Sequence, residues 1–269
     1  MQIYYLILYF FTYGFLGWCT EVAFASVKER RFVNRGFLNG PICPIYGVGV
    51  SAVVFLLEPW KESLVLLYIS SVVVVTLIEG ITGYAMDKVF HHKWWDYSDQ
   101  PLNIGGYVCL IFSLIWGIAC VVIMKLVHPL IQSLLSWIPF VIGLILVVIL
   151  SIVLFADLYV TASTILKLNR HLETMERIAQ ELHELSEKVG SNIHENVMDT
   201  IEKQEEGKKK LEEGKKKLDE LKEKYTELTR KGSKVGKRLL KAFPKMESRR
   251  HKDILNELRT ALEERFKKS

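Results

Sequence analysis

Three acidic side chains lie inside long apolar segments of the chain, where an ionisable group is costly. They are Glu21, Glu79 and Asp157, and their segments are residues 3–25, 63–85 and 137–160. A helix of about 20 residues crosses a hydrocarbon core of about 30 Å, so each segment can span a membrane. A carboxyl group there costs free energy unless it faces a partner or a wet cavity, and it therefore marks a candidate functional site. The alternative is a carboxylate that stays solvated at the headgroup boundary.

The chain has two unlike parts. Residues 1–160 are largely apolar and hold 8 of the 35 basic residues and 9 of the 30 acidic ones. The remainder is strongly charged, and the net charge of +5 is a property of this tail. The pattern predicts an all-α protein, with a polytopic bundle of membrane helices over residues 1–160. We expect an extended or coiled-coil helical tail over residues 161–229, then a basic segment and a C-terminal amphipathic helix over residues 230–269.

About five transmembrane helices are expected. Residues 107–127 are long enough to span, whereas residues 44–57 are short and either span or re-enter. Basic residues in short loops stay on the cytoplasmic side. The loops after the first and third spans are the most basic, and the charged tail follows the fifth. The sequence therefore predicts a multi-pass protein of the cell membrane, with the N-terminus outside and the C-terminus in the cytoplasm.

The metal-binding residue types are scattered. The four cysteines lie singly in or beside apolar segments, and no C-x-x-C occurs. His91 and His92 are adjacent, so on a helix their side chains would diverge. We expect neither a metal site nor a cofactor.

Glycine and proline interrupt the first of the basic loops, N-R-G-F-L-N-G-P-I-C-P-I-Y-G, residues 34–47. Such a run cannot form an uninterrupted helix, and irregular backbone at membrane depth needs cover by protein or a wet cavity. We interpret residues 36–47 as a broken or re-entrant entry into the second apolar segment, with a plain interfacial turn as the alternative. The expected turn residues are Gly36, Gly40, Pro41, Pro44 and Gly47.

The loop after the third span contains W-W-D-Y-S, residues 94–98. Aromatic rings are enriched at the membrane interface, which is sufficient to explain a tryptophan there. It does not explain Asp96 and Asn103 so near the apolar boundary. We expect these two residues at the mouth of a polar cavity that the three acids share.

Several of these runs together resemble one bacterial family. They are G-W-C-T-E of the first span, the glycine- and proline-rich loop, W-W-D-Y-S, and N-I-G-G-Y-V-C-L; the tail run R-L-L-K-A-F-P-K-M-E-S is also similar. The family is described as Putative ABC-transporter type IV and is permease-like. The resemblance implies a permease component and supplies no substrate. It also implies further site positions, Trp116 among them.

The candidates for a substrate or ion site come from the residue pattern and from the family resemblance together. Arg35 is expected to pair with one of the acids, because an unpaired buried charge is costly. The full set is Glu21, Glu79, Asp157, Arg35, Asn34, Asp96, Asn103, Trp18, Trp95, Tyr97 and Tyr46.

The tail has heptad character. From Ile165 apolar residues recur at alternating steps of three and four, and E-E-G-K-K-K-L occurs twice, seven residues apart. This spacing is typical of a coiled coil. A coiled coil between copies and a helix or hairpin within one chain remain equal alternatives. The basic residues 230–252 could bind anionic lipid, and no nucleic acid is expected.

The leading functional hypothesis is a permease-like transport component. The run G-S-K-V-G-K-R at residues 232–238 lacks the spacing of a phosphate loop, so any ATPase would be a separate subunit. The alternatives are a membrane enzyme acting on a lipid or lipid-linked substrate, with one acid as acid or base, and a scaffold or sensor with a coiled-coil tail. Membrane lipids and a second copy, through the tail, are the other expected partners.

The topology is open to a direct test. A cysteine introduced at Pro59 should react with an impermeant thiol reagent added outside intact cells, because this loop is expected to be external. A cysteine at Lys167 should not react until the membrane is broken. Labelling of Lys167→Cys in intact cells would reverse the assignment.

Overall fold

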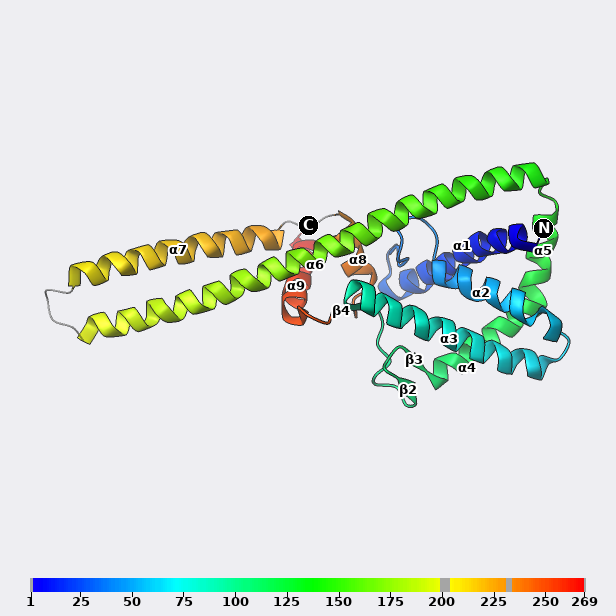
Figure 1. Ribbon diagram of the computed structural model, residues 1–269, viewed down its shortest axis with the longest axis horizontal. Coiled ribbons are helices and arrows are strands. Elements are labelled where there is room, and N and C mark those ends of the chain that lie inside the picture. The colour runs from blue at the N-terminus through cyan, green and yellow to red at the C-terminus, as the bar shows by residue number, and fades with distance from the viewer. Residues whose placement is uncertain (1, 199–203, 231–233, 269) are drawn as a thin grey trace. The chain divides into compact units, whose positions relative to one another are not determined.

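The computed structural model describes residues 2–198, 204–230 and 234–268 (Figure 1). Gly232 and Ser233, the first two residues of the run that resembles a phosphate loop, lie outside this part of the chain. The chain divides into two compact units. Unit 1 comprises Met1–Ser163 and Arg238–Arg249, and unit 2 comprises Thr164–Lys237 and Arg250–Ser269.

The helices confirm the prediction of an all-α membrane bundle. Four of those described are long and apolar enough to cross a membrane: Ile3–Glu29, Leu64–Phe90, Leu110–Ser136 and Phe140–Val189. The second apolar segment is the short helix α2 (Pro44–Leu57), continued by a 3-10 turn η1 (Glu58–Trp60). At 1.5 Å per residue the 14 residues of α2 measure about 21 Å, less than the roughly 30 Å hydrocarbon core.

The other elements of unit 1 follow in chain order. Helix α1 covers Gln2–Glu29, α3 covers Leu64–Phe90, α4 covers Leu110–Val122, and α5 covers His128–Ser136. A π-helical turn, η2 (Ile123–Val127), joins α4 to α5, and α6 begins at Phe140 and continues to Met198. Between α3 and α4 lie the short strands β1 (His92–Lys93), β2 (Asn103–Ile104) and β3 (Val108–Cys109).

Local sequence explains where these helices begin and end. Pro44 occupies the first turn of α2, where a missing N–H costs nothing. The Ser63 hydroxyl accepts a hydrogen bond from the Leu66 amide at 3.4 Å and caps α3. At its other end α3 stops at His91, whose φ of 57° is left-handed.

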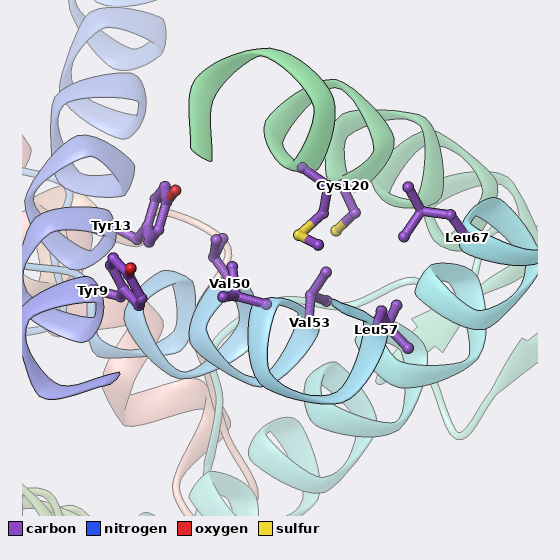
Figure 2. Packing of buried hydrophobic residues seen from close by; sticks show 9 residues of the cluster. Tyr9, Tyr13, Val50, Val53, Leu57, Leu67 and Cys120 are labelled. Atoms are coloured by element: carbon purple, nitrogen blue, oxygen red, sulfur yellow. The ribbon is translucent and has the colours of Figure 1, made fainter. Parts of the chain in front are cut away.

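A hydrophobic cluster joins α1, α2, α3 and α4 (Figure 2). Tyr9 and Tyr13 come from α1, Val53 and Leu57 from α2, and Cys120 from α4. Because lipid is as apolar as these side chains, helix association in a membrane depends on close packing rather than on burial from water. The cluster is therefore evidence of shape fit between the helices.

Glycines allow α1 and α2 to approach closely. Gly47 lies inside α2 rather than in the irregular loop where we expected it, because the helix already begins at Pro44. A Cβ atom at Gly47 would lie only 2.5 Å from the Phe10 carbonyl oxygen of α1. Its role is close approach between helices, as small residues provide in membrane proteins.

Residues 238–249 return to unit 1 from the far end of the chain. Strand β4 (Glu247–Ser248) pairs antiparallel with β1, placing His92 opposite Ser248. The end of helix α8 (Lys234–Ala242) contributes buried Leu239 and Leu240 to unit 1. The Phe243 ring meets the Trp94 ring edge to face, with centroids 4.9 Å apart. Part of the basic run is thus folded against the bundle.

Unit 2 is an intramolecular helical hairpin with a third helix. Helix α7 (Gln204–Arg230) runs back along α6 (Figure 1), and His171 Nε2 lies 2.9 Å from the Leu228 carbonyl oxygen. Buried Leu172 and Met175 lie on α6, and Leu255 and Leu258 on α9 (Lys252–Lys268) are also buried. Of the alternatives for the tail, the described residues use the apolar face within one chain.

The hairpin predicts an intramolecular cross-link. A Cβ atom at Gly214 would lie 2.9 Å from Val189 Cγ2. With the native cysteines replaced by alanine, Val189→Cys and Gly214→Cys should form a disulfide that leaves the chain monomeric on a non-reducing gel. The control pairs Val189→Cys with Glu223→Cys, which lies about 13 Å farther along α7. Disulfide-linked dimers from the first pair at every protein concentration would contradict the hairpin.

Candidate functional site

Glu21 is held by a cation and a phenol. The Tyr46 hydroxyl of α2 donates to Glu21 Oε1 at 2.7 Å, and Arg35 Nε lies 3.3 Å from Glu21 Oε2. Gly17, one turn earlier on α1, has no side chain to collide with the Tyr46 ring. That ring also meets Trp116 edge to face, at 5.7 Å between centroids. Arg35 therefore pairs with an acid as expected, and both oxygens of Glu21 are occupied.

Asp157 is held by the loop between α1 and α2. The Asn39 amide N–H and side-chain Nδ2 donate to Asp157 Oδ1 at 3.1 and 2.7 Å, and the Gly40 N–H donates to Oδ2 at 2.6 Å. The Thr161 hydroxyl, one turn later on α6, adds a longer bond of 3.3 Å. Charge-assisted hydrogen bonds of this kind stabilise an ionised carboxylate without a cation. Asp157 thus fixes the backbone just before Pro41.

Arg238 holds the same loop from the other side. Its guanidinium donates to the carbonyl oxygens of Gly36 at 2.7 Å and Phe37 at 2.9 Å, and to Asn39 Oδ1 at 3.1 Å. Burial lowers the pKa of Arg238, and the nearby Asp157 carboxylate opposes this shift. The side chain of Asn39 therefore connects Arg238 to Asp157.

Trp18 and Asn34 also belong to the loop's framework. The Trp18 indole donates to Asn34 Oδ1 at 2.8 Å, and the Gly36 N–H donates to the same oxygen at 3.2 Å. Asn34 Nδ2 in turn donates to the Asn39 carbonyl oxygen at 2.8 Å. An asparagine that bonds backbone groups two and five residues ahead stabilises a turn. Both residues therefore have a structural role in this geometry.

Glu79 on α3 differs from the other two acids. The Tyr97 hydroxyl is 3.2 Å from Glu79 Oε1 and donates to it. Oε2 is buried without a hydrogen-bond partner among the described residues, and Glu79 as a whole is 8% exposed. The Tyr97 ring stacks on Phe112 at 4.8 Å between centroids. Burial raises the pKa of Tyr97, and the carboxylates of Glu79 and Glu21 raise it further.

Asp96 and Asn103 organise the loop between α3 and α4. Lys93 Nζ donates to Asp96 Oδ1 at 2.6 Å, and the Ser98 N–H donates to the same oxygen at 2.9 Å. Burial opposes ionisation of Asp96, but these hydrogen bonds outweigh it and lower the pKa below its usual range. Asn103 Oδ1 accepts from the Gly106 N–H at 3.1 Å, where a φ of 72° favours glycine.

Asp87 and Arg249 form an ion pair that the sequence analysis did not single out. Arg249 Nη2 lies 2.8 Å from Asp87 Oδ2, and Nε donates to the same carboxylate at 3.0 Å. The Tyr107 hydroxyl donates to Asp87 Oδ2 at 2.6 Å, and Trp95 donates to the Tyr107 carbonyl oxygen at 2.9 Å. The Asp87 carboxylate raises the pKa of Arg249. The position of Asp87 at the end of an apolar segment was the available signal.

A second missed pair lies at the hydrophobic cluster. The Tyr13 hydroxyl and His128 Nδ1 are 2.9 Å apart, and the Tyr9 ring meets the imidazole edge to face at 4.8 Å. His128 directly follows the π-helical turn η2. Such turns inside α-helices are frequent at functional sites. The histidine is buried within the bundle.

The three acids each have partners of their own, and Glu21 also acts electrostatically on Tyr97, the partner of Glu79. Glu21 binds Arg35 and Tyr46, Glu79 binds Tyr97, and Asp157 binds the loop through backbone and side-chain amides. Within the described residues no group of three His, Cys, Asp or Glu side chains could hold a metal ion.

A comparison with known protein families identifies the family of this chain. The model of the family described as Putative ABC-transporter type IV matches residues 8–162. The chain belongs to this family. No match was found among curated proteins or among solved structures. As a member of the Putative ABC-transporter type IV family, the chain is a transport-related membrane protein.

The family match covers most of unit 1 but does not include Arg238–Arg249. All three intramembrane acids lie within residues 8–162, so they belong to the Putative ABC-transporter type IV part of the chain. Arg238 and Arg249 lie outside the match, although both bind side chains or backbone within it. The family region is completed by contacts from the tail.

The role of Arg238 can be tested by hydrogen exchange. A charged hydrogen bond contributes about 1.5–3 kcal/mol, so Arg238→Gln should make the loop open more often. We expect amide exchange of peptides covering Gly36–Gly40 to speed up roughly tenfold, measured by mass spectrometry. Lys245→Gln, an exposed position of the same returning segment, should leave these peptides unchanged. Equal exchange in all three proteins would show that Arg238 does not hold the loop.

Proposed function

We propose that the chain is a permease-like component of a transport system, with its polar site at the end of the bundle that carries residues 30–43 and 91–109. By the distribution of basic residues, this end faces the cytoplasm. Family membership and the four apolar helices support this proposal. The three intramembrane acids lie near these loops, through their contacts with Arg35, Tyr97 and Asn39.

The contrast between Glu79 and the other acids carries the proposal. Glu21 is paired with a cation, and Asp157 receives backbone N–H groups, so each is satisfied by the fold itself. Glu79 keeps a buried oxygen without a partner among the described residues. A membrane helix rarely retains such a group without use, because its burial is costly. Glu79 with Tyr97 is therefore the point where we place contact with the transported species.

We propose that a separate ATPase subunit supplies the energy. The chain's one run that resembles a phosphate loop has three residues between its glycines instead of four, and arginine follows its lysine. Such a subunit would bind from the cytoplasmic side, where the basic loops and the helical tail are expected. We also propose assembly between copies through the tail, although the buried apolar residues of the described tail already pack within one chain.

Copurification tests the proposal. The full-length chain, purified in mild detergent, should bring with it an ATPase subunit and ATP hydrolysis. Glu79→Gln should accumulate in the membrane and retain the partner, yet lower the hydrolysis at least roughly tenfold, because an interaction needed during turnover is lost. Glu62→Gln is the matched control, since its side chain is 84% exposed.

The other outcomes distinguish the alternative functions. A copurified lipid that the protein modifies without ATP would favour a membrane enzyme. A soluble protein held by the tail, with no ATPase, would favour a scaffold or sensor. Full hydrolysis by Glu79→Gln would remove this residue from the transport site.

A further inference from the structure

Glu79 differs from Glu21, Asp87, Asp96 and Asp157, four other acids that lie in or beside the apolar helices of unit 1. Asp87 has Arg249, Asp96 has Lys93, and Glu21 has Arg35. Asp157 has no direct cation but accepts two backbone N–H groups. Glu79 accepts one hydrogen bond, from a phenol, on one of its two oxygens.

The cations near this end of the bundle are already engaged. Arg35, Lys93 and Arg249 each pair with another carboxylate, and Arg238 is bound to loop carbonyls. None of these contacts reaches Glu79. An ionised Glu79 would thus be a desolvated charge with a single neutral donor, which is unfavourable.

A proton satisfies this geometry better than a metal ion. The carbonyl oxygen of a carboxylic acid can accept the Tyr97 hydrogen bond, and its hydroxyl group carries no net charge. A hard cation would need about six oxygen ligands, and the described contacts of Glu79 provide the carboxylate and one phenol. The absence of a three-residue metal group among the described residues agrees with this.

We propose that Glu79 and Tyr97 form a proton-binding site, with the proton on Glu79 Oε2 and the Tyr97 hydroxyl bonded to Oε1. Release transfers the proton to water and leaves a carboxylate, so the net change at the site is one negative charge. The inference rests on the proposed function only for the claim that this site serves transport. Binding of the proton itself does not depend on it.

The ionisable groups on the neighbouring elements define the site's electrostatics. On α3 itself, Asp87 lies two turns away and is neutralised by Arg249. From α1, Glu21 influences Tyr97 but is paired with Arg35. The loop after α3 contributes Tyr97, Cys109 and the Lys93–Asp96 pair, and α4 contributes the uncharged ring of Phe112. None of these described groups provides Glu79 with a cation that would stabilise its ionised form.

Infrared difference spectroscopy of the full-length protein in lipid nanodiscs tests the proposal. A protonated carboxyl group gives a carbonyl band at higher wavenumber than a carboxylate, and the band shifts when water is replaced by D2O. The wild type should show such a band, and raising the pH should remove it. Glu79→Gln should lack the band altogether. Tyr97→Phe should retain it at a shifted frequency, because Oε1 loses its hydrogen bond.

Glu21→Gln is the matched control, because its carboxylate is ion-paired and should contribute no protonated band. A band that survives in Glu79→Gln, or one that disappears only in Glu21→Gln, would overturn the assignment. If Glu79→Gln fails to fold, an unshifted band in Tyr97→Phe has the same effect. This experiment is independent of the ATPase assay: a missing ATPase leaves the proton site standing, and a missing band leaves the transport role standing.

Discussion

A charged group inside a membrane bundle must find a partner, and this constraint accounts for the contacts of Glu21, Asp87 and Asp157. The carboxylate of Asp157 illustrates it, because the loop between α1 and α2 supplies three N–H donors to it. The same loop then presents its carbonyl groups to Arg238. A loop rich in glycine can turn both kinds of backbone group toward charges, which a helix cannot do. The irregular backbone of this loop thus supplies the hydrogen-bond partners that Asp157 and Arg238 require.

The positions of the charges divide structural from functional roles. Asp96, Asn103 and Asn34 bond within their own loops, and Trp18 of α1 donates to the Asn34 side chain. Those bonds explain why these polar residues lie so near apolar helices. The same reasoning explains Asp87 through Arg249. Glu79 is the exception that such bonds do not explain. Glu79 differs from these residues because one of its carboxylate oxygens has no hydrogen-bond partner among the described residues.

The positions of the helices could be predicted from the sequence, whereas the contacts between distant side chains could not. Length and hydropathy located the apolar segments, because a span of the membrane imposes a minimum of about 20 residues. Gly47 was misplaced, since composition alone does not show that Pro44 already starts a helix. Arg238 and Arg249 were read as part of a solvated or lipid-binding run, because contacts between residues 162 to 202 positions apart leave no local pattern. The heptads of the tail indicated helix pairing but could not tell pairing within a chain from pairing between copies.

The return of residues 238–249 to unit 1 has a consequence for biosynthesis. The helices of the bundle enter the membrane in chain order, yet β1 has no strand partner and Asp87 no guanidinium until β4 and Arg249 have been synthesised. A ribosome has to translate the whole helical hairpin first. During that interval the loops after α1 and α3 lack these contacts, and a chain truncated before residue 238 would lack the bonds of Arg238 and Arg249 altogether.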